Sequence, residues 1–120
     1  MLARDTGVFK DTQTLLKIVC DITFLFPKQL KHTLGQEAIK SCIEMLSCIQ
    51  MINVSPNEKR MEWFDEFIVY EERLRAMMEV GMDYDFSKIG TRRIAVYTDL
   101  INKIGKQMSG WRKSSQSHKN

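Results

Sequence analysis

The sequence predicts an all-α fold, namely an antiparallel, up-down-up-down four-helix bundle. Along four segments the apolar residues recur at steps of three and four, which is the period of a helix with one buried face. Proline, glycine and capping residues separate these segments, and the apolar–polar alternation of strands is not visible. Short bends between amphipathic helices imply antiparallel neighbours. We therefore expect a single domain over residues 1–113, followed by a flexible polar tail over residues 114–120.

The first helix is predicted over residues 11–27, after a loose polar terminus at residues 1–9. Pro27 ends this helix, because the residue before a proline avoids the α region. The predicted inward face carries Leu15, Val19, Ile22 and Phe26.

The second helix is predicted over residues 34–54, after a bend at Lys28–His32. Thr33 and Gln36 have the spacing of a capping box, in which the threonine hydroxyl accepts from a backbone amide and the glutamine reaches back. The predicted inward residues are Ile39, Cys42, Ile43, Leu46 and Ile49.

The third helix is predicted over residues 56–80. Ser55, Pro56 and Glu58 match the preferences for the N-cap, N1 and N3 positions, and Gly81 is predicted at C′ in a left-handed conformation. The apolar stripe holds Met61, Phe64, Ile68, Glu71, Leu74 and Met78.

Glu71 is a carboxylate on this apolar stripe, and a buried carboxylate must be paired or neutral. Arg75, one turn further on, or a basic residue of the fourth helix can pair with it. The alternative, which we favour, is that Glu71 lies half exposed at the edge of the stripe.

The fourth helix is predicted over residues 88–111, after an acidic loop at residues 82–86 and with Ser87 as its cap. Its apolar residues alternate steps of four and three, which is a heptad seam. The seam consists of Gly90, Ile94, Tyr97, Ile101, Ile104, Met108 and Trp111.

Several apolar residues lie off these stripes, and a single bundle has little room to bury them all. We expect some of them to cover an oligomer interface, although scattered surface apolar residues are also common. They are Phe24, Met45, Met51, Trp63, Phe67 and Tyr70.

Composition excludes several classes of protein. The chain has 120 residues, 43% apolar and 28% charged, which is typical of a soluble domain, and no apolar run is long enough to cross a membrane. No secretory signal is visible. Cys20, Cys42 and Cys48 lie in predicted helices, so we expect inert buried thiols in a reducing cytoplasm.

Catalytic chemistry is not indicated. His32 lies in a bend and His118 in the tail, and neither has a cysteine or carboxylate at metal-ligand spacing. No nucleophile has a placed base. We therefore expect a non-enzyme with no cofactor and no metal.

Charge is distributed unevenly along the chain. Residues 86–120 hold eight basic residues against one acidic, a net +7, whereas residues 58–85 hold four against nine, a net −5. The basic segment can meet a polyanion, or an acidic helix can simply pair with a basic one. Lys106, Arg112 and Lys113 also suit the C-terminal end of a helix dipole, but Arg92 and Arg93 stand near the N-terminal end, where the dipole does not favour them.

Three stretches together carry a resemblance to a known family: FPKQLKHTLGQ (residues 26–36), ERLRAMMEVG (72–81) and INKIGKQMSGW (101–111). Over about residues 10–113 the chain resembles the accessory variability determinant proteins of diversity-generating retroelements. These are related to the bacterial 23S rRNA intervening-sequence proteins, which form the same kind of bundle. The resemblance implies a homopentameric ring whose basic surface binds RNA and DNA and engages a reverse transcriptase, with no active site of its own.

The family pattern in the third helix, Leu-Arg-x-x-x-Arg, is only partly present. Leu74 and Arg75 match it, but Glu79 stands at the second basic position, and Arg73 adds a base on another face. The predicted nucleic-acid-binding residues are Arg73, Arg75, Lys28, Lys31, Arg92, Arg93, Lys103, Lys106, Arg112 and Lys113. Contacts would be mostly to phosphate.

Two functions therefore remain open. The first is a pentameric, nucleic-acid-binding accessory subunit of a reverse transcriptase, which supports mutagenic copy-DNA synthesis. The alternative is a stand-alone bundle of the intervening-sequence type, with a structural or protein-interaction role and no polymerase partner.

Overall fold

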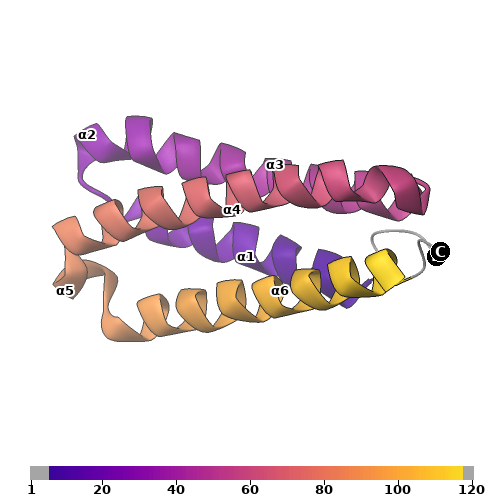
Figure 1. Cartoon of the computed structure of the whole chain (residues 1–120). Coiled ribbons are helices and arrows are strands. Elements are labelled where there is room, and N and C mark those ends of the chain that lie inside the picture. The colour runs from indigo at the N-terminus through magenta and orange to yellow at the C-terminus, as the bar shows by residue number, and fades with distance from the viewer. Residues whose placement is uncertain (1–5, 118–120) are drawn as a thin grey trace.

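The computed structural model describes residues 6–117, and helices make up nearly all of them. Four long helices, α1 (Gly7–Phe24), α3 (Gln36–Val54), α4 (Asn57–Tyr84) and α6 (Thr91–Ser117), form the body. Two short ones, α2 (Lys28–Leu30) and α5 (Phe86–Ile89), lie at the same end of the molecule (Figure 1). No strand occurs in this part of the chain, so the predicted all-α class is confirmed.

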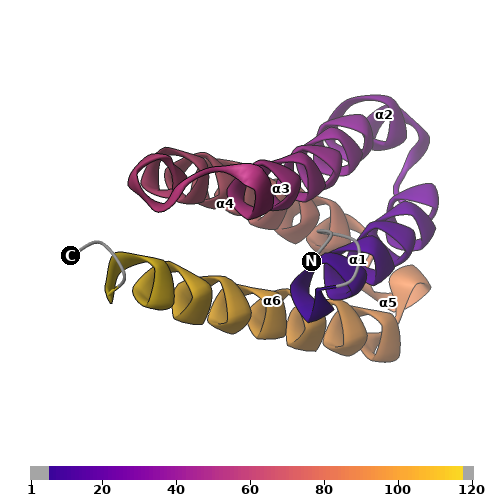
Figure 2. The ribbon, with the colours of Figure 1, turned by 90° about the vertical axis from the view of Figure 1, so that its right-hand side faces the viewer.

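The four long helices pack in a ring of neighbours. α3 contacts α1 and α4, and α6 contacts α1 and α4. Figure 2 shows α3 and α4 close together along their lengths, with α1 beside α6. The molecule is elongated, with extents of 51 × 24 × 20 Å.

Helix α1 begins earlier than predicted. Its N-cap is Thr6, whose Oγ1 accepts a hydrogen bond from the Phe9 amide at 3.2 Å, and both Val8 and Phe9 are buried. The expected loose terminus is therefore wrong for residues 6–9, while residues 1–5 lie outside the described part. The helix ends at Phe24, three residues before Pro27.

The corner between α1 and α3 is helical rather than an irregular bend. After Pro27 come α2 and a π-helical turn, η2 (Lys31–Gly35), which runs directly into α3. Thr33 lies inside this turn, and its Oγ1 donates to the carbonyl oxygen of Gln29 at 3.0 Å. The predicted capping box is wrong, because Thr33 bonds backward to a carbonyl as mid-helix threonines do.

The start of α4 also differs from the prediction. Ser55 is the C-cap of α3, and its backbone amide donates a hydrogen bond to the carbonyl oxygen of Met51 at 3.0 Å. Pro56 occupies the N-cap position of α4 and no side chain caps it. The predicted boundary shifts by one residue, and the expected serine cap is absent here.

Helix α4 continues four residues past the predicted end. Gly81 is buried inside it and does not have a positive φ; the predicted C′ role is wrong because this glycine provides room for the Phe26 ring. The chain reverses instead at Gly90, whose φ of 89° lies in the left-handed region. The predicted cap Ser87 lies inside α5, and Gly90 is the C-cap of that short helix. Helix α6 begins at Thr91 rather than residue 88, and residues 82–84 are helical rather than a loop.

The core agrees with most of the predicted stripes. Leu15, Val19, Ile22 and Phe26 are all buried, and so are the fourth-helix residues Tyr97, Ile101, Ile104 and Met108. Ile43 and Ile68 are exposed, which contradicts the prediction, whereas the off-stripe residues Met45 and Phe67 are buried in the core.

Helix α6 extends to Ser117, beyond the predicted end at residue 111. Ser115 is buried, and its Oγ accepts from Arg60 Nη1 at 3.4 Å. The predicted tail is therefore helical over residues 114–117, and residues 118–120, including His118, lie outside the described part.

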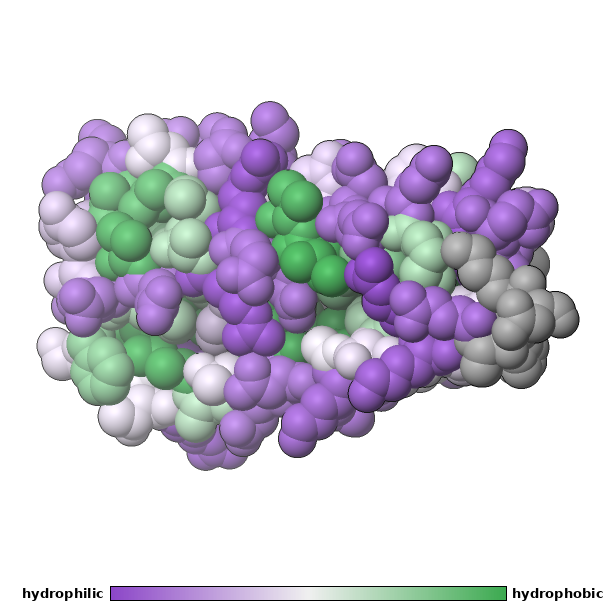
Figure 3. Space-filling view, in the orientation of Figure 1, coloured by the Kyte–Doolittle hydropathy of each residue, from purple (hydrophilic) through white to green (hydrophobic). Residues whose placement is uncertain are grey.

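Apolar side chains also reach the surface. Figure 3 shows hydrophobic patches on one face, separated by hydrophilic side chains. The exposed large apolar residues include Phe24, Ile43, Val54, Ile68, Val69, Tyr84 and Val96. Of the six residues predicted for an oligomer interface, Phe24 and Met51 are exposed, and Trp63 and Tyr70 are partly buried.

Candidate nucleic-acid interface

The ten predicted basic residues do not form one compact patch. Lys28, Lys31, Arg92 and Arg93 belong to elements at the α2–α5 end of the bundle (Figure 1). Arg112 and Lys113 lie near the opposite end, in the last turns of α6. Arg73, Arg75, Lys103 and Lys106 lie between them, on α4 and α6.

The outer face of α6 gathers the largest number of these cations. Its heptad seam is buried or partly buried, and the positions two residues after each seam residue form a second row on the solvent side. That row reads Arg92, Val96, Asp99, Lys103, Lys106, Gly110 and Lys113, and every member is exposed. We call its four cations, Arg92, Lys103, Lys106 and Lys113, the basic stripe of α6. At 1.5 Å per residue it is about 30 Å long.

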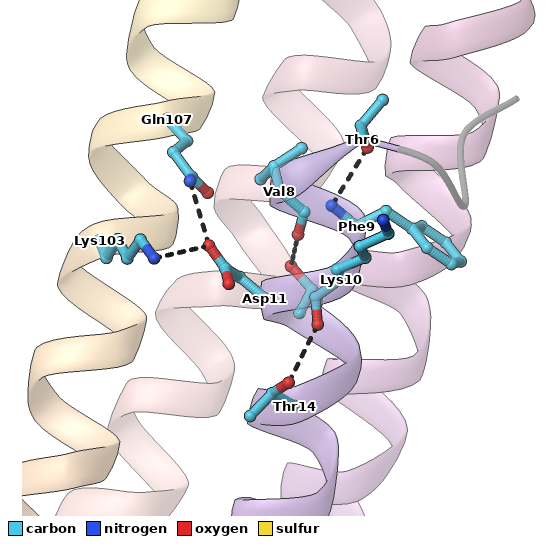
Figure 4. A network of polar contacts seen from close by, with 9 residues as sticks. Thr6, Val8, Phe9, Lys10, Asp11, Thr14, Lys103 and Gln107 are labelled. Atoms are coloured by element: carbon cyan, nitrogen blue, oxygen red, sulfur yellow. Dashed lines mark hydrogen bonds and ion pairs between the residues drawn. The ribbon is translucent and has the colours of Figure 1, made fainter. Parts of the chain in front are cut away.

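Lys103 is partly neutralised by α1 (Figure 4). Its Nζ lies 3.3 Å from Asp11 Oδ2, and Gln107 Nε2 donates to the same oxygen at 3.1 Å. Asp11 thus ties α1 to α6 at the middle of the basic stripe. Because the Lys103 side chain is 61% exposed, the pair is screened by solvent and contributes at most about 1 kcal/mol.

Arg75 is held at the α4–α6 contact. Its Nη2 donates to Glu71 Oε2 at 3.4 Å, and its Nη1 donates to Asn102 Oδ1 at 3.2 Å. Burial raises the pKa of Glu71, and the nearby Arg75 guanidinium opposes that rise. The favoured expectation of a half-exposed Glu71 is wrong, since this residue is 9% exposed and paired.

Gly105 explains why a carboxylate fits at this contact. A Cβ atom at position 105 would lie 3.2 Å from Glu71 Oε2, so any other residue there would displace the carboxylate by a few tenths of an ångström. The charge of Arg75, the best match to the family pattern, is therefore balanced within the molecule.

Arg112 is also paired, with its Nη2 2.7 Å from Asp65 Oδ1. Among residues 6–117 the ion pairs involve only Arg75, Lys103 and Arg112 of the ten candidates. The bases of α6 without a carboxylate partner in this part of the chain are Arg92, Arg93, Lys106 and Lys113. Intramolecular pairing of an acidic and a basic helix thus accounts for only part of the charge.

Two candidates stack on aromatic rings. Lys31 Nζ lies 4.4 Å from the centroid of the Phe24 ring, and the Arg73 guanidinium carbon lies 5.7 Å from that of Tyr70. Phe24 is 71% exposed. An exposed ring beside a cation is a combination that unpaired bases can stack on. Sequence reasoning missed this contact between Phe24 and Lys31, because no local pattern predicts that residues seven apart will meet.

The three cysteines differ in exposure. Cys42 and Cys48 are buried, and burial raises the pKa of their thiols to about 12 and about 11. Cys20 is exposed, so the expectation of a buried thiol is wrong there.

Within the described ranges no group of three or more histidine, cysteine or acidic residues could hold a metal. In the same ranges no helix is long and apolar enough to cross a membrane.

Fold and surface define the chain as a small all-helical protein that presents a row of cations along its last helix. It belongs to the bAvd-like family, the accessory variability determinant type, whose model matches residues 8–115. The predicted family resemblance is thereby confirmed, while the relation to intervening-sequence proteins stays a prediction. No curated protein matches the chain, and no solved structure does.

Proposed function

We propose that the protein is a non-catalytic, nucleic-acid-binding accessory subunit of a retroelement reverse transcriptase. In this role it associates with the enzyme and its RNA template, and supports mutagenic copy-DNA synthesis. The proposal includes an antiparallel up-down-up-down bundle, assembly into a homopentamer, and a cytoplasmic location. Family membership supports it, because the resemblance to accessory variability determinant proteins implies a partner enzyme.

The observation that carries the nucleic-acid part is the basic stripe of α6. Lys106 and Lys113 are exposed, lie two helical turns apart on one face, and have no carboxylate partner among the described residues. Exposed cations of this kind attract phosphates, because their binding releases the counterions of the nucleic acid. Contacts of this kind bind RNA and DNA with little sequence preference.

The test is a salt series of binding to structured RNA and to duplex DNA. Lys106 and Lys113 are both replaced by glutamate, and the matched control replaces Lys40 and Lys59, two exposed lysines on α3 and α4. Both variants change the net charge equally. We expect the α6 variant to lower the slope of log K against log salt by about 1.4–1.8, the loss of two phosphate contacts, with a smaller change in the control. Equal effects in both variants would contradict a localised interface.

The partner is tested separately. Affinity purification of the protein co-expressed with a retroelement reverse transcriptase should recover both proteins, and light scattering should give about five copies per particle. Nucleic-acid binding without any polymerase association would instead favour the alternative, a stand-alone bundle with a structural role. Exposed Ile43, Ile68 and Val69 on α3 and α4 supply apolar area that self-assembly could cover.

A further inference from the structure

Two adjoining hollows lie between α1 and α6. The first has a volume of about 390 Å³ and reaches from Ile18 and Asp21 on α1 to Arg92, Arg93 and Val96 on α6. The second, about 360 Å³, shares Ile18 and Val96 and continues to Lys103. We call the two together the α1–α6 groove. Hollows of this size are typical of small-ligand sites.

The groove has an apolar floor. Ile18 and Val96 line both hollows, and Leu100 continues the floor in the second. Val96 remains 46% exposed, although its apolar side chain would gain from being covered. At the mouth Gly90 has no side chain, and a Cβ there would meet nothing within 4 Å. The floor can therefore accept a flat apolar face from outside.

Cations flank this floor. Arg93 Nη1 donates to the carbonyl oxygen of Ile89 at 3.0 Å, which fixes its guanidinium at the wall of the first hollow. Arg92 is exposed beside it, and Lys103 lies at the other end. Neither arginine has an ion pair within residues 6–117. Guanidinium groups with free N–H donors suit a phosphate.

Two carboxylates also line the groove, Asp21 on α1 in the first hollow and Asp99 on α6 in the second. Asp21 lines the first hollow, is exposed, and has no ion pair with any described base. A carboxylate only accepts hydrogen bonds. Adenine, cytosine and guanine carry an exocyclic amino group that can donate to it, whereas thymine has only its ring N3–H.

We propose that the α1–α6 groove binds one unpaired nucleotide, with the base on Ile18 and Val96 and the phosphate on Arg92 and Arg93. The inference rests on the proposed nucleic-acid-binding function and assigns a strand type to it. In a duplex the base faces are stacked on their neighbours, so only an unpaired base can use the apolar floor. Asp21 gives the site a preference for bases with an amino group.

The experiment compares wild type with Val96→Asn, which makes the floor of the groove polar without changing charge. Thr98→Asn, at an exposed position on another face of α6, is the matched control. Probes are fluorescently labelled oligo-dA, oligo-dT and a duplex of equal length. We expect Val96→Asn to weaken oligo-dA binding up to about tenfold, because the base loses its apolar contact with the valine, with duplex binding unchanged. Thr98→Asn should bind all three probes as wild type does.

A second variant keeps the test independent of the first. Asp21→Asn should reduce the preference for oligo-dA over oligo-dT, because an amide can also donate to the thymine carbonyl. If wild type binds all probes and neither variant changes single-strand binding, the groove is not a nucleotide site, although the proposed function stands. That result is also expected if another protein segment occupies the groove. If wild type binds no probe, both proposals fall.

Discussion

The ring of Phe26 lies directly on the backbone of Gly81, in the space that a side chain at position 81 would occupy. Phe26 is 1% exposed and lies two residues after the end of α1, whereas Gly81 lies near the end of α4. This contact fastens the α1–α3 corner to the long helix α4, and it depends on a residue without a Cβ.

Gly81→Ala should therefore destabilise the fold by about 1–3 kcal/mol, because overpacking outweighs the better helix propensity of alanine. Urea unfolding followed by circular dichroism measures this. Gly110→Ala is the matched control, since its Cβ would meet nothing within 4 Å, and it should stabilise α6 by about 0.5–1 kcal/mol. Equal changes in the free energy of unfolding at both glycines would show that the contact with Phe26 does not affect stability.

Threonine caps offer a second comparison, between an observed cap and one that the sequence only suggested. Thr6→Ala removes the hydroxyl that caps α1 and should cost about 1 kcal/mol. Thr33→Ala removes a hydroxyl bonded backward to Gln29 O and should be neutral or stabilising by about 0.5 kcal/mol. A larger loss at Thr33 than at Thr6 would restore the capping-box interpretation.

The sequence was sufficient to predict the helices and most of the core, since the period of apolar residues depends only on which face is buried. It could not place the ends that tertiary contacts decide. Gly81 was interpreted as a helix end because isolated glycines often are, yet its neighbour Phe26 lies 55 positions away in the chain. The site was predicted less completely. Which cations remain unpaired depends on contacts such as Lys103 with Asp11, and these join residues too distant for any local pattern.

The buried carboxylate of Glu71 predicts a pH effect on stability. Burial raises its folded-state pKa, so the native state holds this proton more tightly than the unfolded chain does. The contribution of Glu71 to stability therefore becomes less favourable as pH rises from the unfolded pKa through the folded one. Glu71→Gln should gain stability relative to wild type across that window and keep the gain at higher pH.

Unfolding free energies measured from pH 4 to 8 test this. Glu79→Gln, at an exposed position of the same helix, is the control for replacing a carboxylate with an amide. Parallel curves for wild type and Glu71→Gln would mean that Glu71 is charged and well solvated in the native state.

The three cysteines should differ in reactivity. Cys20 is exposed, whereas Cys42 and Cys48 are buried with pKa values of about 12 and about 11. Because the thiolate is the reactive form, a thiol reagent at pH 8 should label one cysteine in the native protein and three after denaturation. Mass spectrometry of the labelled peptides identifies the site, and rapid labelling of Cys42 in native protein would contradict its burial.

The last prediction separates Arg75 from the basic stripe of α6. Arg75 matches the family pattern, but its guanidinium is bonded to Glu71 and Asn102, so little of its charge is available to phosphates. Lys106 is exposed and has no carboxylate partner in the described part of the chain. In salt series with duplex DNA, Lys106→Ala should lower the slope of log K against log salt by about 0.9, while Arg75→Ala should change it much less. The reverse order would mean that a phosphate displaces Glu71 from Arg75 on binding, so that the α4–α6 contact belongs to the interface.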